Sequence, residues 1–125
     1  MLKTDSINPV DLGTAEHYIW GGVCEGWHLL KHAELSVIYE RVPAGAGEVK
    51  HFHSRARQFF YVLSGRATLE LEQQSISFGP GQGVHVEPGV LHRFVNMCEE
   101  EVIFLVISLP TTAGDRTNIN PEQRS

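Results

Sequence analysis

The stretch GAGEVKHFHSRARQFFYVLSG, from Gly45 to Gly65, decides how this chain folds. It places His51 and His53 one residue apart and Gln58 five residues later, between glycines typical of turns. Successive side chains of a strand point to opposite faces, so His51 and His53 share one face. At a rise of ~3.3 Å per residue their rings lie about 6–7 Å apart, and both can reach one metal ion. The stretch therefore predicts a strand with a metal-binding face.

The segments around this stretch are short apolar runs separated by glycine and proline turns. Strands are expected at residues 27–31, 35–42, 48–53, 58–63, 67–72, 75–78, 84–87, 93–96 and 102–109. No segment has a convincing helical period. Many short strands of this kind predict an all-β fold, an antiparallel sandwich or barrel with an interior lined by alternate residues. We expect His51 and His53 to point into that interior.

The length of 125 residues fits a single domain. A barrel core is expected at about residues 34–110, with an N-terminal arm at 1–33 and a polar C-terminal tail at 111–125. The net charge of −5 at pH 7 argues against a nucleic-acid surface. The N-terminus lacks the apolar core of a signal peptide, and the apolar run at 102–109 is far shorter than the ~18–20 residues of a membrane span. We therefore expect a cytoplasmic protein that binds neither nucleic acid nor membranes.

Two patterns of spacing in the chain resemble the two sequence motifs of the cupin family. The first is G-x5-H-x-H-x4-Q-x6-G at residues 45–65, and the second is G-x5-E-P-G-x2-H-x3-N at residues 81–96. A single His-x-His pair is often incidental, but its combination with His92 at this spacing favours a metal site. The chain resembles the small single-domain cupins of the RmlC-like type, often described as mannose-6-phosphate-isomerase-like. The resemblance implies a jelly-roll barrel, the antiparallel double-stranded β-helix.

The resemblance also implies one divalent metal ion held by His51, His53, Gln58 and His92. The family usually has a glutamate at the position of Gln58. A neutral glutamine leaves the charge of a site with a divalent ion near +2, where a glutamate would give about +1. Such a site favours an anionic ligand, such as a carboxylate or an enolate. Gln58 either ligates the ion through its carbonyl oxygen or hydrogen-bonds a bound water, and the donor set accommodates Zn, Ni, Fe, Mn, Co or Cu.

The walls of the pocket are expected to carry two phenylalanines and a further histidine. Phe60 shares a strand face with Gln58, and Phe94 shares one with His92. His85 lies on a short predicted strand close to the second motif, where a pocket-wall or structural role is expected. No catalytic residue is identified, because a general base would have to come from outside the metal ligands. Glu48 and Glu87 are the candidates, but an exposed or structural role is expected for both.

Two classes of function follow from this site. The first is a metal-dependent enzyme acting on a small organic anion, of dioxygenase, isomerase or cyclase type. The alternative is a non-catalytic cupin that binds or senses a small molecule. The resemblance further implies a homodimer formed through barrel edges, for which the strand at 102–109 and the N-terminal segment are the expected contacts.

Overall fold

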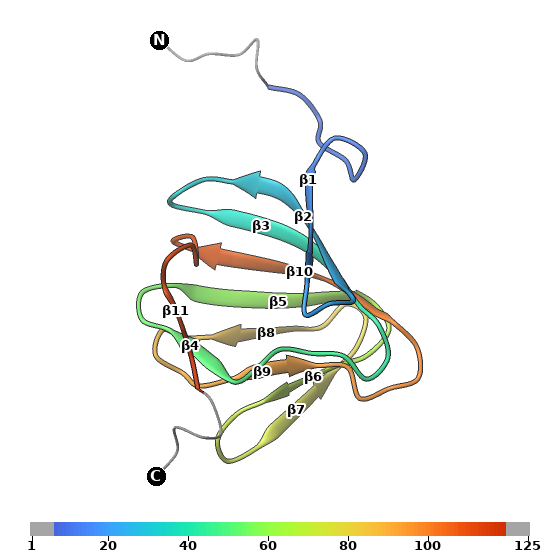
Figure 1. The fold of residues 1–125 in the computed structure, drawn as a ribbon, viewed down its shortest axis with the longest axis vertical. Coiled ribbons are helices and arrows are strands. Elements are labelled where there is room, and N and C mark those ends of the chain that lie inside the picture. Colours follow the sequence, from blue (N-terminus) through green and yellow to red (C-terminus); the bar gives the residue numbers. More distant parts are fainter. Residues whose placement is uncertain (1–6, 120–125) are drawn as a thin grey trace.

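The computed structural model describes residues 7–119, and every regular element in them is a β-strand. The strands are β1 (Glu16–Trp20), β2 (Cys24–Lys31), β3 (Ser36–Val42), β4 (His51–His53), β5 (Arg57–Ser64), β6 (Ala67–Glu70), β7 (Ser75–Phe78), β8 (Gly83–Val86), β9 (Arg93–Val95), β10 (Val102–Leu109) and β11 (Arg116–Asn118). All pairings between them are antiparallel. This confirms the predicted all-β antiparallel fold (Figure 1).

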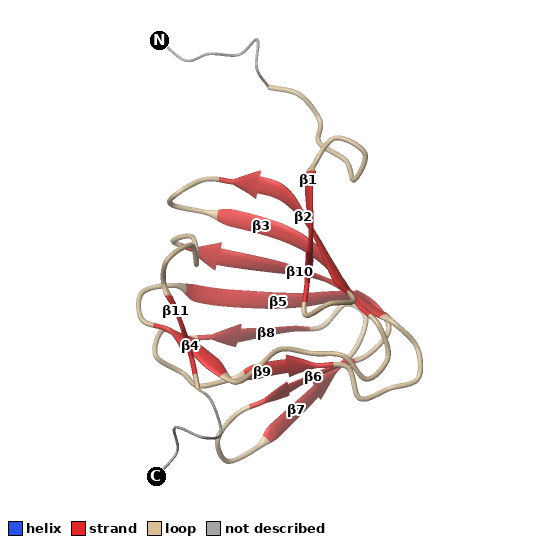
Figure 2. Cartoon of the chain, viewed as in Figure 1, coloured by secondary structure: helices blue, strands red, loops and turns tan. Residues whose placement is uncertain are grey.

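The strands form a large sheet that faces two smaller ones. The large sheet has the order β1-β2-β3-β10-β5-β8, while β7-β6-β9 and β11-β4 form the smaller sheets. In Figure 2 the smaller sheets lie below and beside the large one, so that the structure encloses an interior. The site described below lies in that interior.

The alternation of side chains along β5 and β10 explains why these strands form the middle of the barrel wall. Gln58, Phe60 and Val62 of β5 are buried, whereas their neighbours along the strand are more exposed. In β10 every second residue from Val102 to Ser108 is buried. A strand with this period of two presents one apolar face to the interior. Phe94 and Phe104 stack within the core with ring centroids 4.0 Å apart.

The first motif is bounded by glycines that the backbone geometry requires. Gly45 and Gly65 have φ angles of 78° and 82°, a left-handed conformation that other residues rarely adopt. A Cβ atom at Gly65 would also clash with the carbonyl oxygen of Glu101. The motif can therefore enter and leave its two strands through tight turns.

The buried Asn96 closes the second motif. Its Nδ2 donates to the carbonyl oxygens of Val42 and Glu100, at 3.0 and 2.7 Å, and its Oδ1 accepts from the backbone N–H of Cys98 at 2.9 Å. These three bonds satisfy the backbone where the chain leaves β9. The side chain thus holds the end of the second motif against the end of β3.

The sheet extends further at both ends of the chain than the sequence predicts. The supposed N-terminal arm contains β1 and β2, which add two strands to the large sheet, and the supposed tail contains β11, which pairs with β4. The strand expected at residues 27–31 is the second part of β2, and regular strands continue on both sides of the expected barrel core at residues 34–110. Hairpin β1–β2 is mostly exposed or half-buried, and its sequence lacks the apolar runs of β5 and β10.

Strand β10 is central rather than at an edge, because it pairs with β3 on one side and β5 on the other. Its backbone hydrogen bonds are used within the sheet, so residues 102–109 cannot form the dimer edge suggested by their apolar sequence. The edges of the large sheet are β1 and β8. In residues 7–119 there is no helix long and apolar enough to cross a membrane.

Candidate metal centre

Three histidines meet inside the barrel because a backbone bridge joins the two motifs. His51 and His53 belong to β4, and His92 immediately precedes β9. The backbone N–H of His51 donates to the carbonyl oxygen of His92 at 3.0 Å, and the N–H of His92 donates back at 2.9 Å. One potential ligand nitrogen of each ring lies within 4.8 Å of the others. The bridge thus sets a compact cluster of three buried imidazoles.

The tautomers of two of these rings are fixed by hydrogen bonds to the backbone. Nδ1 of His51 lies 2.8 Å from the carbonyl oxygen of Val49, and Nδ1 of His92 lies 2.8 Å from that of Val90. A carbonyl oxygen only accepts, so each Nδ1 carries the hydrogen and each Nε2 keeps its lone pair. Metal-binding histidines are commonly oriented in this way. The buried Nε2 of His92 has no hydrogen-bond partner, so the cluster fits a metal ion.

Burial keeps the three imidazoles neutral. It lowers the pKa of His51 and of His53 to about 4, and for His53 the neighbouring His51 and His92 act in the same direction. Burial also lowers the pKa of His92. Only a neutral imidazole offers a lone pair to a metal, so the cluster is ready to bind a cation well below neutral pH.

Zinc binding at about pH 5.5 is expected to release fewer than about one proton from the three histidines. With pKa values near 4 the two β4 rings are already neutral at this pH; rings with an ordinary pKa of about 6.5 would be mostly protonated and would release nearly three protons. Zinc affinity is accordingly expected to change little from pH 7 to about 5.5 and to fall as the pH drops through about 4. Calorimetric titrations in two buffers of different ionisation enthalpy count the protons, and a release of two or three would contradict a neutral cluster.

Gln58 lies at the edge of the same interior. Its side chain is 8% exposed, and its Nε2 donates to Ser108 Oγ at 3.3 Å. This bond leaves the amide Oε1 buried and without a partner. An unpaired buried acceptor beside the histidine cluster fits either a metal ion or a water bound to one.

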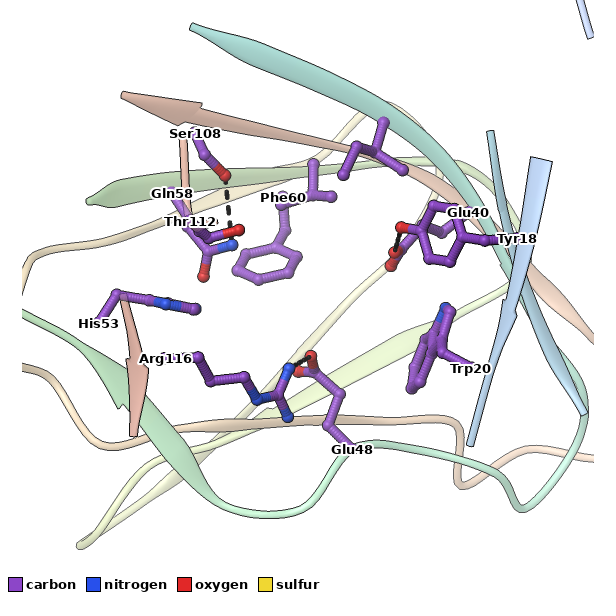
Figure 3. Close-up of a pocket in the computed structure, with 12 residues that line it drawn as sticks. Tyr18, Trp20, Glu40, Glu48, His53, Gln58, Phe60, Ser108, Thr112 and Arg116 are labelled. Atoms are coloured by element: carbon purple, nitrogen blue, oxygen red, sulfur yellow. Dashed lines mark hydrogen bonds and ion pairs between the residues drawn. The ribbon is translucent and has the colours of Figure 1, made fainter. Parts of the chain in front are cut away.

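A cavity opens between His53 and the first strands of the large sheet. Its volume is about 200 Å³, below the roughly 300–1,000 Å³ typical of sites for drug-sized ligands. His53, Gln58 and Phe60 line one part of it, together with Ser108 and Thr112 (Figure 3). The cavity therefore suits a small ligand that can reach the metal-binding face.

The rest of the lining comes from residues that the sequence did not single out for the pocket. Tyr18, Trp20, Glu40 and Arg116 all face the cavity, and Glu48 joins them. The sequence suggests Glu48 only as a candidate base, and in the structure its Oε2 lies 3.8 Å from Nε2 of His51. Burial raises the pKa of Glu48, although the guanidinium of Arg116 opposes this effect. Tyr18 and Trp20 come from the segment assigned to an arm, for which the sequence leaves open whether the aromatic side chains cap the core or line a pocket mouth. Arg116 comes from the segment assigned to a tail, where no local pattern indicates a role.

Arg116 is brought to the cavity by the residue before it. The buried Asp115 carboxylate accepts hydrogen bonds from the backbone N–H groups of Ser54, Arg55 and Ala56, at 2.9–3.3 Å. The following strand β11 pairs with β4, with Arg116 opposite His53. Nη1 of Arg116 then lies 3.4 Å from Oε2 of Glu48. A lone Asp-Arg pair in a polar tail is the only signal the sequence offers for this arrangement.

Two residues expected in the pocket wall lie elsewhere. Phe94 is 1% exposed and packs against Phe104 and Phe60, in the core beyond the cavity. His85 is exposed, because Val84 and Val86 turn inward on β8 and the residue between them must turn outward. Its Nε2 lies 3.3 Å from Nη1 of Arg57. Glu87 is also exposed and does not line the cavity, so of the two base candidates only Glu48 faces the cavity.

The chain matches a known protein family and is similar to several known proteins. The model of the cupin domain matches residues 38–108. Over 90 residues the chain is 33% identical to an oxidoreductase of Arthrobotrys oligospora, covering 66% of this chain but only 36% of that protein. An RmlC-like cupin from Shewanella frigidimarina is similar in structure, with a TM-score of 0.74, 24% identity, and 85% and 93% of the two chains covered. A sugar phosphate isomerase of the cupin superfamily from Silicibacter pomeroyi has a TM-score of 0.70 and 20% identity, with 91% and 93% covered.

Proposed function

Since this chain belongs to the cupin domain family, we propose that it binds one divalent metal ion through His51, His53 and His92 and acts on a small organic anion. The observation that carries the proposal is the buried Nε2 of His92, which has no partner within a cluster of three neutral imidazoles. Gln58 would contribute its Oε1, either to the ion or to a water on it. A bound divalent ion would supply Lewis acidity toward a carboxylate or enolate oxygen.

Charge supports an anionic ligand. None of the three histidines carries a charge at neutral pH, and Gln58 adds none, so the ion would keep nearly its full charge. Arg116 places a guanidinium at the wall of the same cavity. Glu48 offsets part of that charge through its contact with Arg116 at 3.4 Å. An anion entering this cavity would meet a positive field at the ion and a bidentate donor in Arg116.

The reaction class follows from which groups can carry a proton. Glu48 is the carboxyl group next to the histidine cluster, and burial raises its pKa. A buried carboxylate of this kind can take a proton from a bound carbon or oxygen acid and return it, which is the work of an isomerase or cyclase. Dioxygenation is the other enzymatic branch and would need a redox metal. The similarity to a sugar phosphate isomerase supports a small-molecule substrate.

The second candidate is a cupin that binds or senses a small molecule without turning it over. Among residues 7–119 the three-residue metal cluster contains only histidines, and the neighbouring carboxylate of Glu48 is already paired with Arg116 at 3.4 Å. This arrangement favours stable ligand binding over proton transfer at the ion. We also propose a homodimer, now with edge strand β1 in contact, since its Ile19 is 64% exposed.

Elemental analysis of the purified protein tests the proposed function. About one divalent metal ion per chain is expected, and no binding of zinc, nickel, iron, manganese, cobalt or copper would overturn it. Zinc alone, with no oxygen uptake on catechols, flavonols or β-diketones, would exclude dioxygenation. Slow release of a bound metabolite without turnover would favour the sensing alternative. Light scattering on the same samples tests the dimer, and a monomer at micromolar concentration would reject it.

Changing Gln58 to glutamate is expected to tighten zinc binding about tenfold and to weaken binding of a small carboxylate to the zinc-loaded protein by about the same factor. The added charge lies beside the metal-binding face, where it attracts the cation and repels an anionic ligand. Calorimetry with zinc, and then with acetate, measures both effects. Gln73→Glu adds the same charge on an exposed turn and serves as the matched control. Equal effects in the two variants would show that Gln58 does not act at the site.

A further inference from the structure

The end of the cavity away from His53 is built by the first three strands. Tyr18 and Trp20 come from β1 and Glu40 from β3, and Figure 3 shows all three facing the cavity from the side opposite His53. Tyr18 and Trp20 share a face of β1 because one residue separates them. Gly26 lies opposite Tyr18 in the adjacent strand, and a Cβ atom there would clash with the phenol ring. The absence of a side chain at Gly26 therefore lets the ring lie across β2.

Two hydrogen-bonding groups at this end are only partly used by the protein. The hydroxyl of Tyr18 donates to Oε2 of Glu40 at 2.9 Å. The indole Nε1 of Trp20 is buried and has no partner, although an indole N–H can only donate. In Figure 3 this nitrogen lies on the edge of the indole that faces Tyr18 and Glu40. An unpaired buried donor and a carboxyl group that line the same cavity leave a place for a ligand atom there.

Glu40 has no cation of its own. Among residues 7–119 no lysine or arginine lies within ion-pair distance of it, and Arg116 contacts Glu48 instead. The other ionisable groups around Glu40 are Tyr18 from β1, Cys24 from β2 and Glu48 from the segment before β4. The charge of Arg116 from β11 also acts on Glu40 and lowers its pKa. Burial, followed by the charge of Glu48, raises the pKa of Glu40 to about 8, so its carboxyl group is largely protonated at neutral pH. It can therefore donate a hydrogen bond as well as accept one.

We propose that Trp20, Glu40 and Tyr18 form a second binding subsite in the cavity, which takes a hydroxyl group of the ligand. A hydroxyl can accept from the indole N–H and at the same time exchange a hydrogen bond with the carboxyl of Glu40. A carboxylate at this end would find no cation in contact with Glu40 among residues 7–119, and an ammonium could not accept from the indole. The inference rests on the proposed function for the opposite end, where the metal site and Arg116 take the anionic group. Together the two ends select a short hydroxy acid.

The test follows the indole N–H signals of the full chain, labelled with nitrogen-15 and free of metal. The chain has two tryptophans, and the signal lost in Trp20→Phe is that of Trp20. The probes are matched acids with and without a hydroxyl: β- and γ-hydroxybutyrate against butyrate, and δ-hydroxyvalerate against valerate. One hydroxy acid is expected to shift the Trp20 signal saturably and to bind about 3- to 10-fold more tightly than its deoxy partner, the effect of one hydrogen bond.

Two variants and a control decide the assignment. Trp20→Phe removes the N–H but keeps an aromatic ring. Glu40→Leu replaces the carboxyl by an apolar group of similar volume. Each variant is expected to lose the preference for the hydroxy acid over its deoxy partner and to keep binding the carboxylate. Trp27→Phe, with its ring against Tyr39, is expected to keep the preference. The proposed subsite would be overturned if every hydroxy acid bound with the same affinity as its deoxy partner, or if no acid shifted the Trp20 signal. It would also be overturned if both variants kept the preference for the hydroxyl. Zinc binding is measured separately on the same protein, so failure of the metal site is seen independently.

Discussion

Replacing His92 with alanine is expected to weaken zinc binding by more than about 100-fold, because loss of a direct ligand should exceed the 10- to 100-fold effect typical of the residues that orient ligands. The change removes one of the three nitrogens that lie within 4.8 Å of one another. The backbone bridge between residues 51 and 92 uses main-chain atoms only and is retained. Competition with a chromophoric zinc chelator measures the affinity, and any turnover of a small organic acid is expected to be lost with it.

His85→Ala is the matched control for that experiment. His85 belongs to the same region of sequence but is exposed on the outer face of β8. Its removal is expected to leave zinc affinity within about twofold of the parent protein, since a surface substitution away from a site has little effect. A loss of affinity in His85→Ala equal to that in His92→Ala would mean that the metal binds outside the barrel.

Replacing Phe94 with alanine is expected to lower the free energy of unfolding by about 3–5 kcal/mol, the usual result of removing a buried aromatic ring. The ring is 1% exposed and stacks on Phe104 and Phe60, so its loss leaves a cavity that the rigid strands around it cannot fill. Urea denaturation measures the change. Zinc affinity of the folded variant is expected to stay within about threefold, because the ring does not line the cavity of the metal-binding face.

Phe59→Ala provides the comparison on the outer face of the barrel. Phe59 is 40% exposed on β5 and lies over Gly83 of the neighbouring strand. With part of its area already in water, its removal is expected to cost roughly 1–2 kcal/mol. If Phe94→Ala instead left stability unchanged and weakened ligand binding, Phe94 would line the pocket as its spacing from His92 suggests.

The sequence predicts those parts of this fold in which local pattern and tertiary contact agree. Strands β7 and β10 have the bounds expected from the sequence, and β10 is the continuous apolar run that ends before Pro110. The spacing of His51 and His53 places both on one face, where the structure brings them together with His92. The alternation of side chains between the two faces of a strand is a property of the backbone, and it does not depend on what the strand packs against.

The parts that could not be predicted depend on pairing between distant segments. Strand β11 has three exposed residues and no apolar pattern, and it exists because Asp115 is held by the backbone of residues 54–56. Tyr18 and Glu40 meet only because β1, β2 and β3 form consecutive neighbours in the sheet. His85 was misplaced since four residues of strand, half of them apolar, do not reveal which face is inside.

The residues that would bind the metal and the residues that would contact the rest of the ligand lie on different strands. The metal-binding histidines belong to β4 and to the residue before β9, whereas Tyr18 and Trp20 lie on the first strand and Arg116 on the last. Mutations in the outer strands can therefore change which molecule is accepted while the histidines remain intact. A related chain that exchanged only these outer segments would inherit the metal chemistry and acquire a different substrate range.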